Sequence, residues 1–256
     1  MEKLKIIIAT HKLYNIPDDD IYFPIFVGSI GKKDILNYQR DDEGANISEK
    51  NNNYSELTGV YWAWKNLDAD FIGVAHYRRH FARGNYWKKS IAHSEDFDGK
   101  LQVGTVIVPR KRKYYIETLY SHYSHSHYEQ HLIETKRIIG ILYPNYLNSY
   151  DKVMSQRSGY MFNMFIMSKE DLNDYCEWLF SILFELENCV DIRNYDSFQG
   201  RLFGRVSELL LNVWIEENQK KVCEIPWIYT ERINKVNKVK SFLGAKLLKK
   251  KFKKSF

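Results

Sequence analysis

The sequence of 256 residues lacks the features of proteins that are stabilised by disulfides, bind a metal through clustered cysteines or span a membrane. Its three cysteines, Cys176, Cys189 and Cys223, stand far apart, so neither a disulfide framework nor a cysteine metal site is expected. No apolar run approaches the roughly 20 residues that a membrane span requires, and the first residues show no signal-peptide pattern. We therefore expect a cytoplasmic protein with reduced thiols.

Acidic residues are missing from one end of the chain. Residues 235–256 contain nine lysines and no Asp or Glu, so the net charge of +6 becomes −3 when these nine lysines are left out. Leu and Phe side chains are interleaved with the lysines, which is typical of a basic amphipathic helix on an anionic membrane surface. Nucleic-acid binding and plain disorder are the alternatives. We favour binding to a membrane, because aliphatic side chains make no favourable contact with the phosphate backbone of a nucleic acid.

Apolar residues, by contrast, are plentiful at 44% of the chain and can fill a sizeable core. Near-continuous apolar runs predict strands that are buried on both faces, and apolar residues at helical spacing predict helices between them. The expected strands are 4–10, 21–30, 71–75, 103–108, 160–167 and 222–229, and the expected helices are 53–66, 172–187 and 205–218. This alternation predicts an α/β domain over residues 1–232, followed by a basic tail over 233–256.

The strand 71–75 ends in an unusual block, His76-Tyr77-Arg78-Arg79. In open α/β sheets, ligands bind beyond the carboxyl ends of the strands, and arginine forks bind phosphate oxygens while they stay charged. The block therefore predicts an anion site for a phosphate or diphosphate, with solvated arginines as the alternative. Thr10 and His11 end the first strand and are expected at the same edge, as is the basic run 110–113, which begins at Arg110 and reads as a flexible loop.

Three further features are candidates for function. Asn53 and Glu56 have the spacing of a helix N-cap and its capping-box partner. Asn163 is a polar residue inside an apolar strand pattern, so it either ties the core together or points at a ligand. Residues 122–131 hold four histidines, of which His127 and His131 are spaced to share a helix face as zinc ligands can. Contact with substrate or simple packing is the favoured alternative to a metal.

Several blocks together resemble one bacterial family. The blocks include His-Tyr-Arg-Arg at 76–79 and Tyr-Trp-Ala-Trp-Lys-Asn at 61–66, with further similarity over 46–51, 54–60, 71–75, 160–167 and 207–213. The family occurs in capsular and O-antigen polysaccharide loci, was long described as a domain of unknown function, and is regarded as glycosyltransferases, some of them galactofuranosyltransferases. The resemblance covers residues 4 to 230, and the tail lies outside it.

The resemblance implies a GT-A-like, Rossmann-type sheet flanked by helices and a nucleotide-sugar donor such as a UDP-sugar. It implies transfer of a hexosyl unit, galactofuranose or galactose, to a lipid-linked or growing polysaccharide acceptor with inversion. Many GT-A enzymes carry an Asp-x-Asp metal motif where this chain has the His-Tyr-Arg-Arg block, so arginines can replace the metal, and the need for Mn²⁺ or Mg²⁺ stays open. The expected donor-binding residues are Thr10, His11, Asn53, Glu56, Tyr77, Arg78 and Arg79.

An inverting transferase needs a base within reach of the acceptor hydroxyl. The candidates are Glu208, His76, Asp196 and Glu56, with Glu208 first because it lies in a matching block near a loop that can receive an acceptor. His127, Asn163 and Arg110 are expected on the acceptor side or on a loop that closes over it. The rival hypotheses are a metal-dependent hydrolase that uses the histidines of 122–131, and a non-enzymatic anion- or nucleic-acid-binding protein.

Overall fold

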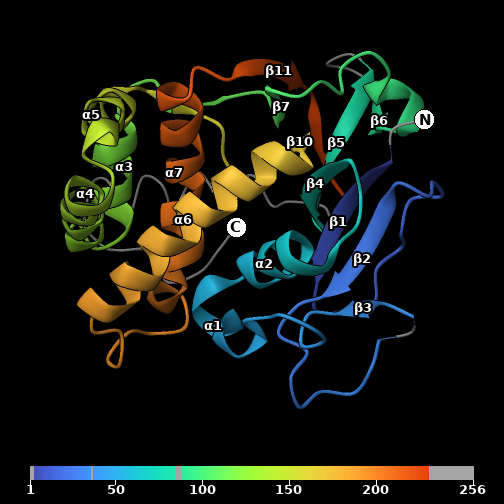
Figure 1. Ribbon diagram of the computed structural model, residues 1–256, viewed down its shortest axis with the longest axis horizontal. Helices are drawn as coiled ribbons and strands as arrows, with labels where there is room; N and C mark the ends of the chain where they lie inside the picture. The colour runs from blue at the N-terminus through green and yellow to red at the C-terminus, as the bar shows by residue number, and fades with distance from the viewer. Residues whose placement is uncertain (1–2, 36, 85–87, 231–256) are drawn as a thin grey trace.

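The computed structural model describes residues 3–35, 37–84 and 88–230. A mixed sheet forms its centre, with the strand order β3-β2-β1-β4-β10-β7-β11 (Figure 1). Near-continuous runs of Ile, Val and Phe in the central strands explain their burial on both faces. The strands of this path are β1 (Leu4–Thr10), β2 (Tyr22–Phe26), β3 (Gln39–Arg40), β4 (Phe71–His76), β7 (Thr105–Pro109), β10 (Phe165–Ser168) and β11 (Lys221–Ile225).

Within the seven strands of this path, one strand runs against the others. The strands β1, β2, β3 and β4 are parallel, and β11 is parallel to β7, whereas β10 is antiparallel to both β4 and β7. The N-terminal end of β10 therefore lies at the same edge as the carboxyl ends of β1, β4 and β7. This edge receives the residues that follow the parallel strands and also those that precede β10.

The two faces of the sheet are covered differently. Ile7, Val74 and Val108 pack against the helices, whereas their neighbours Ile6 and Ile107 belong to a second core on the opposite face. The helices are α1 (Asn51–Tyr54), α2 (Leu57–Asn66), α3 (Leu119–Ser126), α4 (Gln130–Leu142), α5 (Leu147–Ser155), α6 (Lys169–Cys189) and α7 (Leu202–Glu217). Figure 1 shows α3, α4 and α5 gathered at the end of the molecule away from β1, β2 and β3.

A small antiparallel ribbon contributes to the second core. In it, β5 (Arg79–Gly84) pairs with both β6 (Lys89–Ile91) and β12 (Trp227–Tyr229), and it continues from β4 through a tight turn. A separate short pair joins β8 (Arg112–Lys113) to β9 (Ser158–Gly159). Short 3₁₀ turns occur at Ser48–Lys50, Ser94–Phe97, Pro144–Tyr146 and Gln199–Arg201.

Most of the predicted elements are confirmed, and the helix predicted over 172–187 is among them as α6. Ser168 caps α6, because its hydroxyl accepts the backbone N–H of Asp171 at 3.1 Å. The Asp171 carboxylate in turn accepts the backbone N–H of Gly104 and the ammonium of Lys220. The cap therefore also ties α6 to the start of β7 and the end of α7.

The structure corrects several predicted boundaries. The helix predicted from Asn53 is broken at Ser55, which has a positive φ of 55°, so α1 and α2 are separate. The strand predicted over 160–167 begins only at Phe165, because the residues before it form a turn. The last predicted strand, 222–229, is divided into β11 and β12 around Pro226, and the loop predicted over 110–113 contains β8. The predicted tail helix lies outside the described residues.

Candidate active site

The carboxyl end of β4 positions the His-Tyr-Arg-Arg block. His76 pairs with Arg79 across the turn to β5, so Tyr77 and Arg78 form the turn itself. Thr230 holds this turn from the end of β12, because its N–H donates to the carbonyl of Arg78 at 3.1 Å and its hydroxyl donates to the carbonyl of Tyr77. The strand-end position predicted for these residues is confirmed, and their backbone is fixed from two sides.

The guanidiniums of Arg78 and Arg79 are half-buried and incompletely satisfied. Among the described residues, the buried Nε of each has no hydrogen-bond partner. Aromatic rings orient both groups: Arg78 lies 5.4 Å from the ring centroid of Tyr77, and Arg79 lies 4.5 Å from that of Phe162. Buried donors without partners are uncommon in folded proteins and are typical of sites that receive a ligand.

Two histidines lie beside these arginines. His76 is opposite Ala9 in the sheet, which brings it next to Thr10 and His11 at the end of β1. Burial, followed by the charge of Arg78, lowers the pKa of His76 well below its usual value. Its Nδ1 accepts the backbone N–H of Arg78 at 3.1 Å, so the neutral ring carries its hydrogen on Nε2. This tautomer makes Nε2 of His76 a hydrogen-bond donor.

Glu208 on α7 is the carboxyl group with the most strongly altered acidity at this edge. Burial raises its pKa to about 7, the negative charge of Glu56 adds to the rise, and the charges of Arg79 and Arg112 oppose it. The backbone N–H of Phe162 also bonds to the Glu208 carboxyl group. A carboxyl group with this pKa is divided between its acid and base forms near neutral pH.

A left-handed turn before β10 positions both carboxyl groups. Phe162 and Asn163 have positive φ values of 79° and 52°, which is unusual for two consecutive residues other than glycine. The Asn163 amide donates to Glu56 at 2.8 Å and to the carbonyl of Gly204 at 2.9 Å, and its oxygen accepts the hydroxyl of Ser207 at 2.8 Å. Asn163 is buried and ties these core segments together, which is one of the two roles predicted for it.

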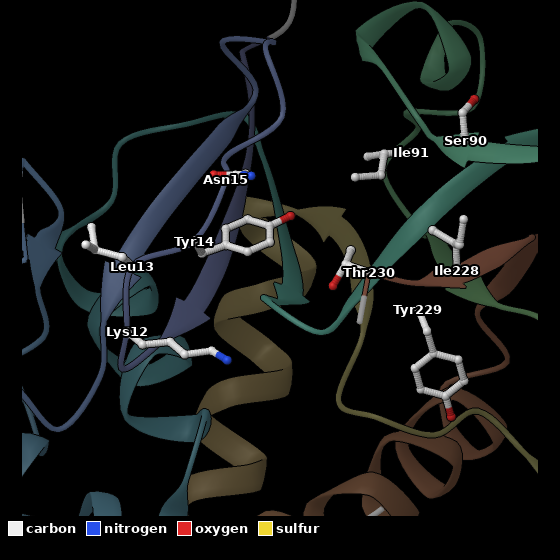
Figure 2. A pocket seen from close by; sticks show the side chains of 9 residues that line it. All are labelled: Lys12, Leu13, Tyr14, Asn15, Ser90, Ile91, Ile228, Tyr229 and Thr230. Atoms are coloured by element: carbon white, nitrogen blue, oxygen red, sulfur yellow. The ribbon is translucent and has the colours of Figure 1, made fainter. Parts of the chain in front are cut away.

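A cavity of about 760 Å³ opens next to the turn after β4. Figure 2 shows side chains from the segment after β1 facing those of β12, with two residues of β6 above them. Lys12 in its wall lies 4.8 Å from the ring centroid of Tyr77, and Tyr229 lies 5.6 Å from the guanidinium of Arg79. The lining residues are Lys12, Leu13, Tyr14, Asn15, Ser90, Ile91, Ile228, Tyr229 and Thr230.

Two predicted site residues, Asn53 and Asp196, have other local roles than expected, and Arg110 stays a prediction. Asn53 does not cap a helix; it lies within α1, and its amide donates to the carbonyl of Gly200. Asp196 is exposed, and its carboxylate accepts two backbone N–H groups, those of Phe198 and Gln199, so it closes a local turn. Arg110 is exposed, and the next arginine of the run, Arg112, is the one that acts on Glu208.

The four histidines of 122–131 bond to different partners and do not form one cluster. Helix α3 ends at Ser126, so His127 and His131 do not share a helix face, which corrects the prediction. His122 and His125 both bond to Glu117, His127 bonds to Gln199 at 3.0 Å, and His131 bonds to the hydroxyls of Tyr123 and Tyr195. In residues 3–35, 37–84 and 88–230, no group of three or more His, Cys, Asp or Glu side chains is arranged to hold a metal ion.

Sequence reasoning missed Arg205 and included Arg112 only as part of the basic run 110–113. Arg205 and Glu208 are three residues apart on α7, which places them on one helix face. Arg205 stacks 4.0 Å from the ring centroid of Phe198, and within the described chain its buried Nη1 and Nη2 have no hydrogen-bond partner. Arg112 acts on Glu208 from β8. The shared face of 205 and 208 was visible in the sequence, whereas the effect of Arg112 on Glu208 depends on the fold.

The fold and the site together define a class. A central, mostly parallel sheet whose main path contains one antiparallel strand, flanked by helices, is a GT-A-like fold. The family described as a domain of unknown function, DUF4422, matches residues 5–219, and the chain belongs to this family. No helix in the described part of the chain has both the length and the apolarity to cross a bilayer.

A solved structure is similar over most of the chain. It is the ligand-free structure of the bifunctional glycosyltransferase WbbM, with 30% sequence identity and a TM-score of 0.81. The similarity covers 90% of this chain and 46% of the WbbM chain, so the protein spans less than half the length of that relative. The comparison with curated proteins gave no match.

Proposed function

We propose that this protein is a glycosyltransferase that moves a hexosyl unit from a nucleotide sugar to a saccharide acceptor. The similarity to WbbM and the GT-A-like fold support the reaction class. The observation that carries the proposal is the pair of carboxyl groups tied to the turn before β10: Glu208 bonds to Phe162 and has its pKa raised to about 7 by burial, and Glu56 bonds to Asn163. For the donor we propose a UDP-sugar, with galactofuranose or galactose as the sugar.

The proposed reaction is a single inverting displacement. Glu208 accepts the proton of the acceptor hydroxyl, and that oxygen forms a bond to the anomeric carbon of the donor. The bond from the anomeric carbon to the phosphate oxygen breaks, and the nucleoside diphosphate leaves with the electron pair. A base with a pKa close to the working pH is suited to this proton transfer.

The leaving diphosphate gains negative charge in the transition state, and the proposed counter-charge comes from arginine. Arg78 and Arg79 are held by a fixed turn, and their Nε atoms have no hydrogen-bond partner among the described residues. Fixed donors aimed at developing charge stabilise a transition state without reorganising. His76 offers Nε2–H to the same oxygens, so its geometry supports a role as donor more than as base. The cavity beside the turn has room for the nucleoside.

For the acceptor we propose a lipid-linked or growing surface polysaccharide at the inner face of the cell membrane. The lysine-rich segment 235–256 supports membrane attachment by its composition. His127 and Asn163, predicted on the acceptor side, are engaged with Gln199 and with Glu56. We therefore assign Asn163 a positioning role and leave acceptor contact to the surface around Glu208.

The decisive experiment is transfer from UDP-sugars to a short acceptor by the wild type and by Glu208→Gln. Loss of the base is expected to lower turnover by about 10²- to 10⁴-fold while donor affinity changes little. Glu177→Gln, an exposed carboxyl on α6, is the matched control and is expected to behave as the wild type. Retained turnover in Glu208→Gln contradicts its role as base.

The donor site is tested separately by thermal shift with UDP and UDP-sugars. Stabilisation that is lost in Arg78→Ala is expected, with the same result in Mn²⁺ and in EDTA if arginines serve in place of a metal. Stabilisation that requires Mn²⁺ overturns the arginine role and keeps the transferase. No response to any nucleotide contradicts the proposed donor site.

A further inference from the structure

The loop between β8 and α3 carries two apolar side chains into solvent. Tyr115 is 76% exposed and Ile116 is 70% exposed. Tyr115 has a positive φ of 59°, which is rare for a bulky residue. Its carbonyl accepts the guanidinium of Arg157 at 3.3 Å. The fold therefore maintains an unfavourable backbone conformation at a place where the side chains gain nothing from burial.

The surroundings of this pair are positive. Arg110, Lys111 and Lys113 are exposed on the preceding segment, and Arg157 is exposed next to β9, whose pairing with β8 brings it beside the loop. None of these four cations forms an ion pair with an acid in the described part of the chain. The one acid of residues 110–118, Glu117, is buried and bonded to histidines.

We propose that this surface, the basic loop tip, docks on an anionic lipid bilayer. It consists of Arg110, Lys111, Lys113, Tyr115, Ile116 and Arg157. Each cation near an anionic leaflet contributes about 1 kcal/mol of attraction, and tyrosine is favoured at the membrane–water interface. A protein partner would need acidic residues and a complementary apolar groove at matching positions. A bilayer supplies anionic headgroups and an apolar layer everywhere on its surface. Charge and exposed apolar area together therefore point to lipid.

Docking through the basic loop tip has a defined orientation. Arg112 lies between Lys111 and Lys113, and its guanidinium lies 4.9 Å from the ring centroid of Tyr114, within electrostatic reach of Glu208. A bilayer docked on the basic loop tip would therefore lie near the surroundings of Glu208, which suits a lipid-linked acceptor if the proposed function holds. The docking itself does not depend on the transferase activity, and its test has a readout that does not use it.

The experiment uses the full chain and vesicles of phosphatidylglycerol with phosphatidylethanolamine, compared with vesicles of phosphatidylcholine. Because residues 235–256 bring nine lysines of their own, a local probe is required. An environment-sensitive fluorophore is placed at Ile116→Cys in a Cys189→Ser, Cys223→Ser background. A matched probe at Ile141→Cys reports an equally exposed apolar position on α4, where Ile141 is 65% exposed. Partitioning is measured in parallel for Tyr115→Ser/Ile116→Ser and for the control Ile141→Ser/Leu142→Ser.

We expect a blue shift at position 116 on the anionic vesicles only, and none at position 141. The double substitution in the basic loop tip is expected to lower the partition coefficient about tenfold, and the control pair is expected to leave it unchanged. No blue shift at position 116 on vesicles that bind the protein overturns the proposal. Normal vesicle binding with loss of turnover on a water-soluble acceptor also overturns it, and assigns Tyr115 to the acceptor saccharide. If no transferase activity is detected, the proposed function fails, and the fluorescence shift on vesicles still decides whether the basic loop tip docks.

Discussion

Replacing Glu56 by Gln should change the pH dependence of the reaction more than its maximum rate. The substitution keeps an oxygen that can accept from Asn163, and Glu56 makes no side-chain cap to α2, so the local structure has little to lose. It removes the second-largest cause of the raised pKa of Glu208. Repulsion between two like unit charges in a partly buried site is on the order of 1–2 kcal/mol, which corresponds to about one pKa unit.

The expected result is an acid limb of kcat/KM that moves from about pH 7 towards lower pH by about one unit. The sign follows because Glu208 ionises more readily once its negative neighbour is gone, so the base form persists to lower pH. Initial rates with one donor across the pH range provide the measurement, and Glu177→Gln removes the same charge at an exposed site on α6 as the control. An acid limb that stays in place, or one that moves to higher pH, refutes the reasoning about Glu56.

Three further outcomes are expected. Asn163→Ala removes the bonds to Glu56, Gly204 and Ser207, so it should lower the free energy of unfolding in urea by about 2–4 kcal/mol; a loss no larger than that of exposed Asn145→Ala would contradict this. Glu208→Gln should raise Tm more at pH 8 than at pH 5. The pKa of Glu208 in the folded protein, about 7, is above the ordinary 4.5, so the wild type loses the stability of the protonated carboxyl group as pH rises through 7, whereas the Gln variant does not. An equal rise in Tm at both pH values would contradict this reasoning. EDTA should leave the Tm of the ligand-free protein unchanged, because the histidines of 122–131 bond to other side chains; one equivalent of zinc by elemental analysis would contradict that.

The central strands and buried helices could be predicted from the sequence because their patterns reflect burial alone. The runs that became β1, β4 and α6 are apolar enough that any compact arrangement buries them. The position of Arg78 and Arg79 at a strand end followed directly from β4. What the sequence did not reveal was the direction of β10, because a short apolar run reads the same in a parallel and in an antiparallel strand.

The site was less predictable, because its parts meet through long-range contacts. Asn53 and Glu56 have capping-box spacing, yet the positive φ of Ser55 ends the helix between them, and the Glu56 side chain turns to Asn163. No local pattern indicates that Asn163 reaches across 107 residues to Glu56. The surroundings of Glu208 likewise draw on β5, β8 and the turn before β10, so its raised pKa is a property of the assembled fold.

The antiparallel β10 has a consequence for the order in which the parts of the sheet and of the candidate site assemble. Its partners β4 and β7 are complete by Pro109, but the gap between them is filled only by Phe165–Ser168. Pairings between segments this distant in sequence form late, because a long loop must close first. A nascent chain therefore carries the arginines of the β4 turn long before it contains Glu208, which lies on α7 after β10. The reactive centre is complete only once α7 has been made, and β11 joins the sheet after that.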